Sequence, residues 1–410
     1  MDNMEKIWLD ELASNAFSKL KTLIVEYCEK LLSMFSFDAI LTRFQNLEEL
    51  TVTDCGSLEV VFHIRELNMS GTHTTSTSQL RELYLERLPK LKHVWSGLPS
   101  SMAKSMTQLE RLVVRSCGVE EIIAGEDGGV RMGASDCFFP RLTTLTLDEL
   151  PKLRSFYKNS HTPTWPHLKE LLVRHCGKMR SFSFASEIQS CQGSTTHENQ
   201  PALSLEKVFP HLKRLTLARE DVAMMQHDIF GDLKELTLAY YHEENVGFPS
   251  EFFLQRFPNL EYLTIEHSSF EEIFSNVFAH EGVTPYGGLI EREKPLKAFG
   301  NLKRFWLNNL WNLRCVWKDG SLMAEILKQT EDLWIWQCPS LSIVFPSLIS
   351  FQSLTYLQIQ NCMGLVHIGT CSAMTSLVHL TRLILRDCGA LKDVVTDDGK
   401  GVEEISFPML

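Results

Sequence analysis

The chain is 410 residues long, carries a formal net charge of −11 at pH 7, and is 44% hydrophobic and 22% charged. The apolar content excludes the disordered class of protein, and the acidic balance argues against nucleic acid or an anionic membrane surface as the main partner. No run of 18 apolar residues occurs, so the sequence predicts no membrane-spanning helix.

Residues 1–16 are interpreted as a partial repeat and entry segment, and they contain no apolar stretch like that of a signal peptide. The sequence has 11 cysteines, an odd number, and no C-x-x-C pair. This usage favours free thiols over a disulfide framework. We therefore expect a cytoplasmic protein.

From residue 17 onward one phrase recurs, L-x-x-L-x-L. Its alternating L-x-L half predicts a short strand with one buried face. A bulky residue three positions earlier, such as Phe44 or Phe257, is expected to fill the interior beneath that strand. The first residues of the thirteen phrases, in chain order, are Leu20, Leu47, Leu80, Leu109, Leu142, Leu168, Leu212, Leu233, Leu260, Leu302, Thr330, Leu354 and Leu380.

Polar insertions interrupt this array near residues 65–78, 124–137, 183–207 and 276–297, and we expect them to form surface loops. The array of about 13 repeats is expected to cover residues 17–410. Residues 407–410 open a further phrase. This favours a chain that is a fragment of a longer product.

A period of 20 to 45 residues with this phrase is typical of the leucine-rich repeat. The sequence predicts an α/β fold, a leucine-rich-repeat solenoid or horseshoe with a parallel sheet on its concave face and irregular turns or short helices on its convex face. One repeat cannot fold alone. Burial of its apolar side chains contributes about 10–15 kcal/mol, whereas ordering its backbone costs roughly 30–60 kcal/mol. Stacking against neighbouring repeats must supply the difference.

Seven cysteines occupy the ninth position counted from the first residue of the phrase. A small polar atom there can bond to turn carbonyls that would otherwise be buried without a partner. We therefore expect a structural ladder rather than metal or redox chemistry, formed by Cys28, Cys55, Cys117, Cys176, Cys338, Cys362 and Cys388.

Motifs for chemistry are missing from the sequence. It contains no G-x-x-x-x-G-K-[ST] phosphate loop, no H-E-x-x-H and no G-x-S-x-G. The 14 histidines are scattered and are expected to be solvated. We expect no catalytic site, no cofactor and no metal.

The residues between the leucines of the phrase should point to solvent, because side chains alternate along a strand. Most are charged residues or threonine, but from the ninth repeat to the twelfth they include aromatic residues. Exposed Trp and Tyr are common anchors of protein interfaces, so we expect a partner-binding face there, unless the long insertions cover it. Its residues are Tyr262, Trp306, Trp334, Trp336 and Tyr356, with Arg304 and Glu266 beside them.

Three phrases carry a resemblance to a known family: FPRLTTLTLDELPKLRSF at 139–156, WPHLKELLVRHCGKMRSF at 165–182 and LTRLILRDCGALKDVV at 380–395. With their alternating C-G-x-L and L-P-x-L endings, they resemble the leucine-rich-repeat region of plant intracellular disease resistance proteins of the coiled-coil, nucleotide-binding, leucine-rich-repeat class. The similarity covers nearly the whole chain.

This resemblance implies a role in plant innate immunity. The repeats would sense a pathogen effector, directly or through a guarded host protein, and would contact the nucleotide-binding domain of a full-length receptor if one is present. The coiled coil and the nucleotide-binding domain do not occur within these residues, so nucleotide switching is not assigned to them. Two alternatives remain: a substrate adaptor of a ubiquitin ligase or general interaction scaffold, and a hydrolase built on the repeats.

Overall fold

The computed structural model describes residue 4 and residues 17–36, 39–40, 43–63, 77–96, 106–124, 139–157, 165–179, 208–218, 230–241, 248–249, 257–275, 302–316, 328–345 and 351–397. The chain forms two compact units. Unit 1 comprises Met1–Leu212 and Glu220–Met225, and unit 2 comprises Lys213–Arg219 and Gln226–Leu410. Most of residues 1–16, most or all of each predicted insertion, and residues 407–410 lie outside the described residues.

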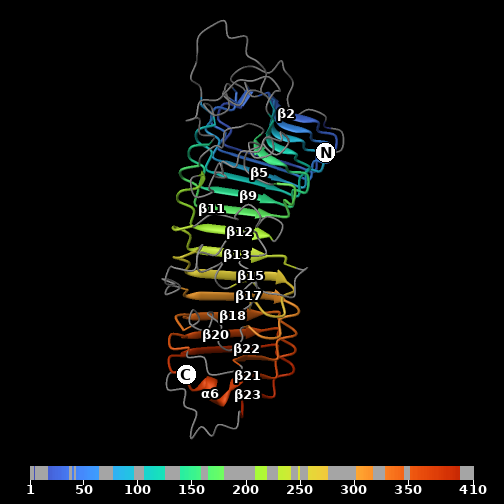
Figure 1. Ribbon diagram of the computed structural model, residues 1–410. Coiled ribbons are helices and arrows are strands. Elements are labelled where there is room, and N and C mark those ends of the chain that lie inside the picture. The colour runs from blue at the N-terminus through green and yellow to red at the C-terminus, as the bar shows by residue number, and fades with distance from the viewer. Residues whose placement is uncertain are drawn as a thin grey trace, which may run out of the picture. The chain divides into compact units, whose positions relative to one another are not determined.

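Unit 1 is built on a parallel sheet in which each repeat contributes one five-residue strand (Figure 1). Neighbouring strands pair in register, so Leu50 lies beside Leu83 and Val52 beside Leu85. The second and fourth residues of each strand point inward and are buried, except for the half-buried Leu23 in the first strand. The strands in order are β1 (Thr22–Glu26), β3 (Glu49–Thr53), β5 (Glu82–Glu86), β7 (Arg111–Arg115), β9 (Thr144–Asp148) and β11 (Glu170–Arg174).

Unit 2 repeats this arrangement. The phrase formed by Leu260, Leu263 and Ile265 is buried, and its strand pairs in parallel with strands from the repeats before and after it. The predicted leucine-rich-repeat sheet is confirmed by these pairings. The strands in order are β12 (Arg214–Ala218), β13 (Glu235–Ala239), β15 (Tyr262–Ser268), β17 (Arg304–Leu310), β18 (Asp332–Trp336), β20 (Tyr356–Gln360) and β22 (Arg382–Arg386).

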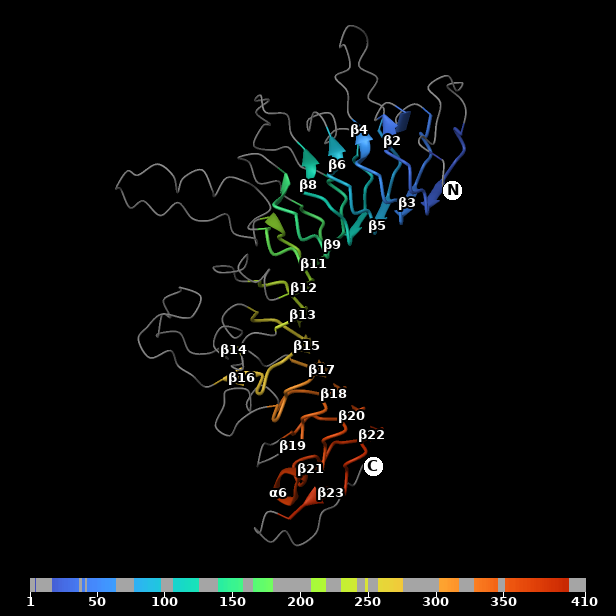
Figure 2. The same ribbon diagram turned by 90° about the vertical axis from the view of Figure 1, so that its right-hand side faces the viewer.

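The opposite side of the repeats differs in part from the expectation of irregular turns or short helices. It carries short parallel strands (Figure 2). In unit 1 these form a second sheet, β2 (Ser33–Ser36), β4 (Val60–His63), β6 (His93–Ser96), β8 (Glu121–Ala124) and β10 (Ser155–Tyr157). In unit 2 they are β14 (Phe248–Pro249), β16 (Phe274–Ser275), β19 (Ile343–Phe345), β21 (His367–Thr370) and β23 (Asp393–Thr396), with one short helix, α6 (Cys371–Met374).

The residues of these short strands explain the difference. The second half of each repeat carries β-branched and aromatic side chains, as in Val60-Val61-Phe62, which favour extended backbone. In-register stacking brings Phe62 beside Trp95 on the next strand, so a second ladder forms at little additional entropic cost.

An aromatic spine fills the core of unit 1. Four of its rings come from the bulky position before a long-sheet strand, and four come from the short strands. Their centroids are 5.0–6.3 Å apart from one ring to the next. The spine consists of Phe44, Phe35, Phe62, Trp95, Phe139, Phe156, Trp165 and Phe209, all of which are buried.

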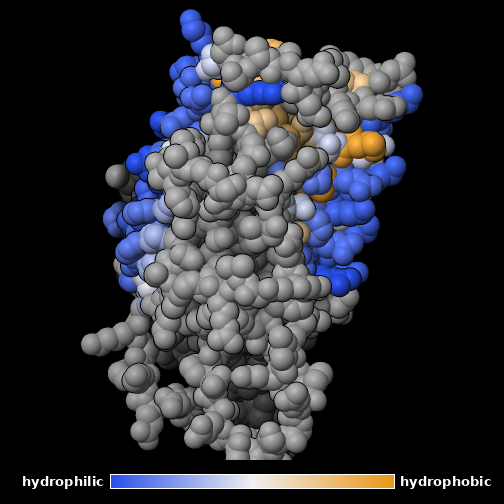
Figure 3. Space-filling view, turned by 90° about the horizontal axis from the view of Figure 1, so that it is seen from above, coloured by the Kyte–Doolittle hydropathy of each residue, from blue (hydrophilic) through white to orange (hydrophobic). Residues whose placement is uncertain are grey.

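Phe17 occupies the same bulky position in the first repeat but remains 45% exposed, so the interior role expected of that position does not hold there. Ile24 and Leu32 of the same repeat are also exposed, and Figure 3 shows apolar side chains gathered at this end of the chain. The Phe17 ring stacks on Phe44 of the next repeat, with centroids 6.0 Å apart, and no described repeat precedes it. Among the described residues, no helix is long and apolar enough to cross a membrane.

Candidate functional site

The open face of unit 2 is formed by the first, third and fifth residues of its strands, because the second and fourth point into the core. In β15, for example, Tyr262, Thr264 and Glu266 lie on this face while Leu263 and Ile265 are buried. In-register pairing aligns equivalent positions across strands. Tyr262 lies beside Arg304, and Trp306 lies beside Trp334.

Three aromatic rings stack across neighbouring strands of this face. The ring centroids of Trp306 and Trp334 are 4.9 Å apart, and those of Trp334 and Tyr356 are 5.1 Å apart. Such pairs contribute roughly 0.5–1.5 kcal/mol each beyond the area they bury. Trp306 is still 41% exposed, and Trp334 is half-buried between its neighbours. The stack therefore presents a large, rigid apolar surface to solvent.

Trp336 lies on the same face at the end of β18 and is 46% exposed. Its neighbours at the fifth position are Asn308 on one side and Gln360 on the other. Because nearly half of Trp336 remains exposed, its ring extends the apolar surface toward the carboxyl edge of the sheet.

Charged side chains border the stack on its N-terminal flank. The Arg304 guanidinium lies 5.1 Å from the centroid of the Tyr262 ring, and its Nε is 2.9 Å from Oδ2 of Asp332. The Arg304 side chain is half exposed, so this ion pair adds about 1 kcal/mol or less to stability. Its effect is to hold the guanidinium in one place beside the rings. Glu266 is half-buried at the fifth position of β15.

A second arginine, which the sequence analysis did not single out, borders the stack on its other flank. The Arg382 guanidinium lies 5.8 Å from the centroid of the Tyr356 ring. The Tyr356 hydroxyl donates to Oε1 of Gln358 over 2.6 Å, which fixes the ring in turn. Arg382 occupies the first position of β22, as Arg304 does in β17, and this shared position is the signal that could have identified it.

All seven residues predicted as a partner-binding face thus lie on the open face of unit 2. The structure joins Trp306, Trp334 and Tyr356 into one stack and places Tyr262 with Arg304 next to it. Trp336 and Glu266 occupy the fifth position, away from the stack's rings.

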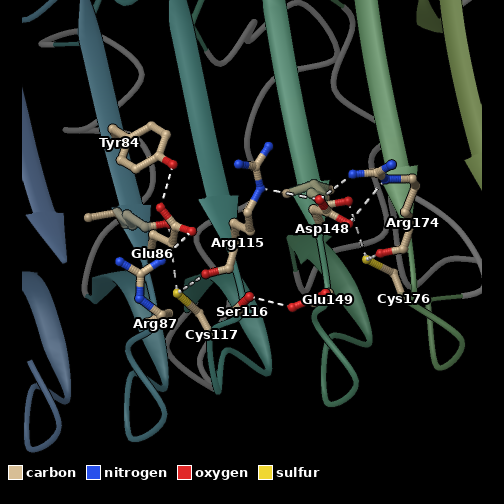
Figure 4. Close-up of polar contacts among 12 residues, drawn as sticks. Tyr84, Glu86, Arg87, Arg115, Ser116, Cys117, Asp148, Glu149, Arg174 and Cys176 are labelled. Carbon is tan, nitrogen blue, oxygen red and sulfur yellow. Dashed lines mark hydrogen bonds and ion pairs between the residues drawn. The ribbon is translucent and has the colours of Figure 1, made fainter. Parts of the chain in front are cut away.

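The open face of unit 1 has another chemistry (Figure 4). The buried carboxylate of Asp148 lies 3.2 Å from Nε of Arg115 and 2.7 Å from Nη2 of Arg174, so one acid joins three strands. The Tyr84 hydroxyl donates to Oε2 of Glu86 over 2.5 Å, and burial together with this carboxylate raises the pKa of Tyr84. The carboxylates of this part of the face are thus engaged in ion pairs or hydrogen bonds with neighbouring side chains.

The ladder cysteines behave alike in both units. Each thiol donates to the carbonyl oxygen two residues earlier, over 3.1–3.5 Å. Burial raises the pKa of Cys55 to about 11 and that of Cys117 to about 12, so these thiols stay protonated and able to donate. In the described repeats that lack the cysteine, the position holds a buried leucine, such as Leu88, the buried Tyr241, or Ser268, whose hydroxyl donates to the carbonyl of Glu266 over 2.8 Å.

A further regular feature was missed by sequence reasoning. In twelve repeats the residue just before the ladder position has a positive φ, between 49° and 63°, although none is glycine. In at least eight of these repeats its N–H donates to the carbonyl of the fifth residue of the next strand, as Asp54 does to Glu86 over 3.1 Å. These residues are Tyr27, Asp54, Arg87, Ser116, Glu149, His175, Tyr240, His267, Asn309, Gln337, Asn361 and Asp387. Their varied side chains conceal the shared backbone geometry.

Neither face offers a metal site in the part of the chain that the structure describes, because no group of three or more His, Cys, Asp or Glu side chains is suitably placed. None of the nine described cysteines forms a disulfide.

Known proteins with similar sequences come from plant disease resistance. The pattern that defines "Plant disease resistance protein RPS2-like, leucine-rich repeats" matches residues 1–99, 96–192 and 207–350. A probable disease resistance protein of Arabidopsis thaliana, At5g47260, is 27% identical over 175 residues. That match covers 39% of this chain but only 18% of the relative, so the chain spans less than a fifth of that protein's length.

Solved structures give weaker matches. An internalin (inlF) of Listeria monocytogenes aligns with a TM-score of 0.35 and 13% identity over 93% of this chain and 83% of its own. TLR13 in its complex with ssRNA13 aligns with a TM-score of 0.31 and 13% identity over 92% of this chain and 55% of its own. The sequence pattern, which covers most of the chain, is the stronger finding: the chain belongs to the RPS2-like leucine-rich-repeat family of plant disease resistance proteins.

Proposed function

We propose that this chain is the recognition part of a cytoplasmic disease resistance protein, and that it has no enzymatic activity of its own. It binds a pathogen effector, or a host protein that the effector modifies, through the open face of unit 2. The family supports the role in defence. The free thiols of the ladder cysteines support a reducing compartment.

The observation that carries the proposal is the stack of Trp306, which is exposed, with the half-buried Trp334 and Tyr356 on the open face. Large aromatic side chains at the centre of a face supply much of the binding energy in protein interfaces. Here they are held by strand pairing and by each other, so little side-chain entropy is lost when a partner docks. Large contiguous apolar patches on a protein surface commonly mark interaction sites, and three adjacent aromatic rings contribute to such a patch.

Site-specific photo-crosslinking tests this proposal. A benzophenone amino acid replaces Gln358, which lies on the open face next to the stack, and the chain is expressed in leaves with and without the pathogen. We expect a crosslinked protein that appears or changes on infection and that mass spectrometry identifies. The double substitution W306A/W334A should abolish that crosslink while the far-UV circular dichroism stays unchanged.

A matched control carries the benzophenone at Thr51, which holds the same third strand position on the open face of unit 1. It should capture nothing specific. Crosslinks that form equally at Thr51, or that survive W306A/W334A in a folded chain, would rule out unit 2 as the recognition face.

A further inference from the structure

The open face of unit 2 carries an uneven distribution of charge. Its acidic side chains lie among the earlier strands, where Glu235 pairs with Arg214 over 3.0 Å and Asp332 pairs with Arg304 over 2.9 Å. β22, the last strand of the long sheet, presents two exposed arginines, Arg382 and Arg386, and neither forms an ion pair within the described part of the chain. The Arg382 guanidinium lies against the Tyr356 ring of the aromatic stack, and Arg386 lies at the other end of the same strand, in a chain whose net charge is −11.

The spacing of these groups defines what they can bind together. Parallel strands lie about 4.8 Å apart, so β22 is roughly 14 Å from β17, which carries Trp306. An extended peptide advances about 3.3 Å per residue and covers that distance in about four residues. One side chain of such a segment could rest on Trp306 and Trp334 while another, about four residues along, reaches β22.

We propose, building on the proposed recognition function, that the partner is bound through an acidic segment. An aromatic or aliphatic side chain of that segment packs on the Trp306–Trp334 pair, and carboxylates about four residues away pair with Arg382 and Arg386. Arginine suits this role because its planar fork accepts a carboxylate in a bidentate manner. Ile384, half-buried between the two arginines, adds apolar contact beneath the segment.

Single-stranded nucleic acid also combines bases that stack on rings with phosphates that pair with cations. The charges of this face disfavour it. Nucleic acid brings one phosphate per nucleotide, whereas on the described part of this face only Arg382 and Arg386 form no ion pair, and the carboxylates of Asp332, Glu266 and Glu235 lie on the preceding strands. A protein segment with a few acids and one apolar anchor matches the face better.

Fluorescence anisotropy with defined probes tests the proposal on the 410-residue chain. The first probe is a labelled ten-residue peptide with one phenylalanine and, four residues on, three consecutive glutamates. The second has glutamines in place of the glutamates, the third has phosphoserines there, and the fourth is a ten-nucleotide single-stranded RNA. Variants are R382E/R386E and, as the matched control, R111E, which reverses an exposed first-position arginine on the open face of unit 1.

We expect the glutamate peptide to bind at least about tenfold more tightly than the glutamine peptide and than the RNA, with a preference that falls as salt is raised. R382E/R386E should reduce binding of the glutamate peptide to the level of the glutamine peptide, and R111E should change nothing. Equal binding of the glutamate and glutamine peptides, tighter binding of the phosphoserine peptide or the RNA, or no binding of any probe would each overturn the acidic-segment proposal.

The outcomes also separate this inference from the proposed function. If both peptides bind equally and W306A/W334A abolishes both, the face recognises protein but not through acidic groups. If W306A/W334A leaves peptide binding and photo-crosslinking unchanged, the recognition function of the face itself is wrong.

Discussion

Units 1 and 2 build their open faces on the same alternation of strand residues, but the faces have different chemistry. In unit 1 the aromatic rings of the spine lie inside, Tyr84 is the one described ring on the open face, and ion pairs around Asp148 link neighbouring strands of that face. In unit 2 three stacked rings occupy the open face, and Arg382 and Arg386 form no ion pair with any described residue. Strand alternation determines which positions face solvent. The residues at those positions determine whether the charged groups pair with one another or remain able to pair with a bound partner.

The largest expected contrast is between an inner ring and an outer ring. Phe62→Ala removes a fully buried ring of the unit 1 spine and should lower the free energy of unfolding by about 3–5 kcal/mol. Trp306→Ala on the open face of unit 2 should cost about 1 kcal/mol or less, because its ring is already partly in water. Urea denaturation of both variants measures the difference. Equal losses would mean that the open-face stack belongs to the core.

A smaller contrast concerns two of the acids that pair with arginine on the open faces, one in each unit. Asp148→Asn leaves Arg115 and Arg174 without their shared carboxylate in a buried position and should cost about 2 kcal/mol. Asp332→Asn breaks a single exposed pair and should cost less than about 1 kcal/mol. Denaturation of both variants in low and high salt distinguishes the two pairs. Because salt should screen the Asp332 pair more than the Asp148 pair, the effect of Asp332→Asn should shrink more in high salt. If both variants behave alike, the ion pairs of unit 1 contribute no more than ordinary surface pairs.

The smallest expected effect is a difference in acid sensitivity. Hydrogen bonds from Lys21, Arg87 and Lys92 lower the pKa of Glu48, Asp54 and Glu59 in unit 1. In unit 2, hydrogen bonds from Lys234 and Lys303 lower the pKa of Glu261 in the same way.

A lowered pKa in the folded state stabilises the fold above the ordinary carboxyl pKa, and this contribution is lost as the pH falls through the lowered value. Amide hydrogen exchange, compared at about pH 5 and about pH 3 after correction for the intrinsic rate, should therefore show a greater loss of protection in unit 1. Arg87→Met removes the hydrogen bond that lowers the pKa of Asp54, so this variant should lose less protection between the two pH values than the unaltered chain. A uniform response in both units would contradict the assignment.

Much of the fold follows from the spacing of apolar residues. The L-x-x-L-x-L phrase predicts both the strands and which residues they bury, and strand alternation is enough to place Trp334 and Trp336 on the open face. The short strands on the opposite side were not predicted, because runs of three or four apolar residues do not distinguish a strand from an irregular turn. They depend on neighbours, such as Trp95 beside Phe62, that only stacking supplies.

The sequence predicts which residues form the candidate site, but it does not predict which of them contact one another. Which rings would stack depends on register, and register across insertions of varying length cannot be counted from the sequence. Arg382 was missed for the same reason, since its contact with Tyr356 joins two strands whose alignment is visible only once they pair.

The residues with positive φ bear on how the sequences of such proteins can evolve. Eight different amino-acid types occupy this corner in twelve repeats, although a left-handed backbone costs a non-glycine residue roughly 1–2 kcal/mol. The stacking of repeats, rather than the residue type, imposes the corner, which in each unit lies where the strands of the open face end. Mutation can therefore change the side chains at these corners one by one while the backbone beneath keeps its shape, which suits the proposed recognition function.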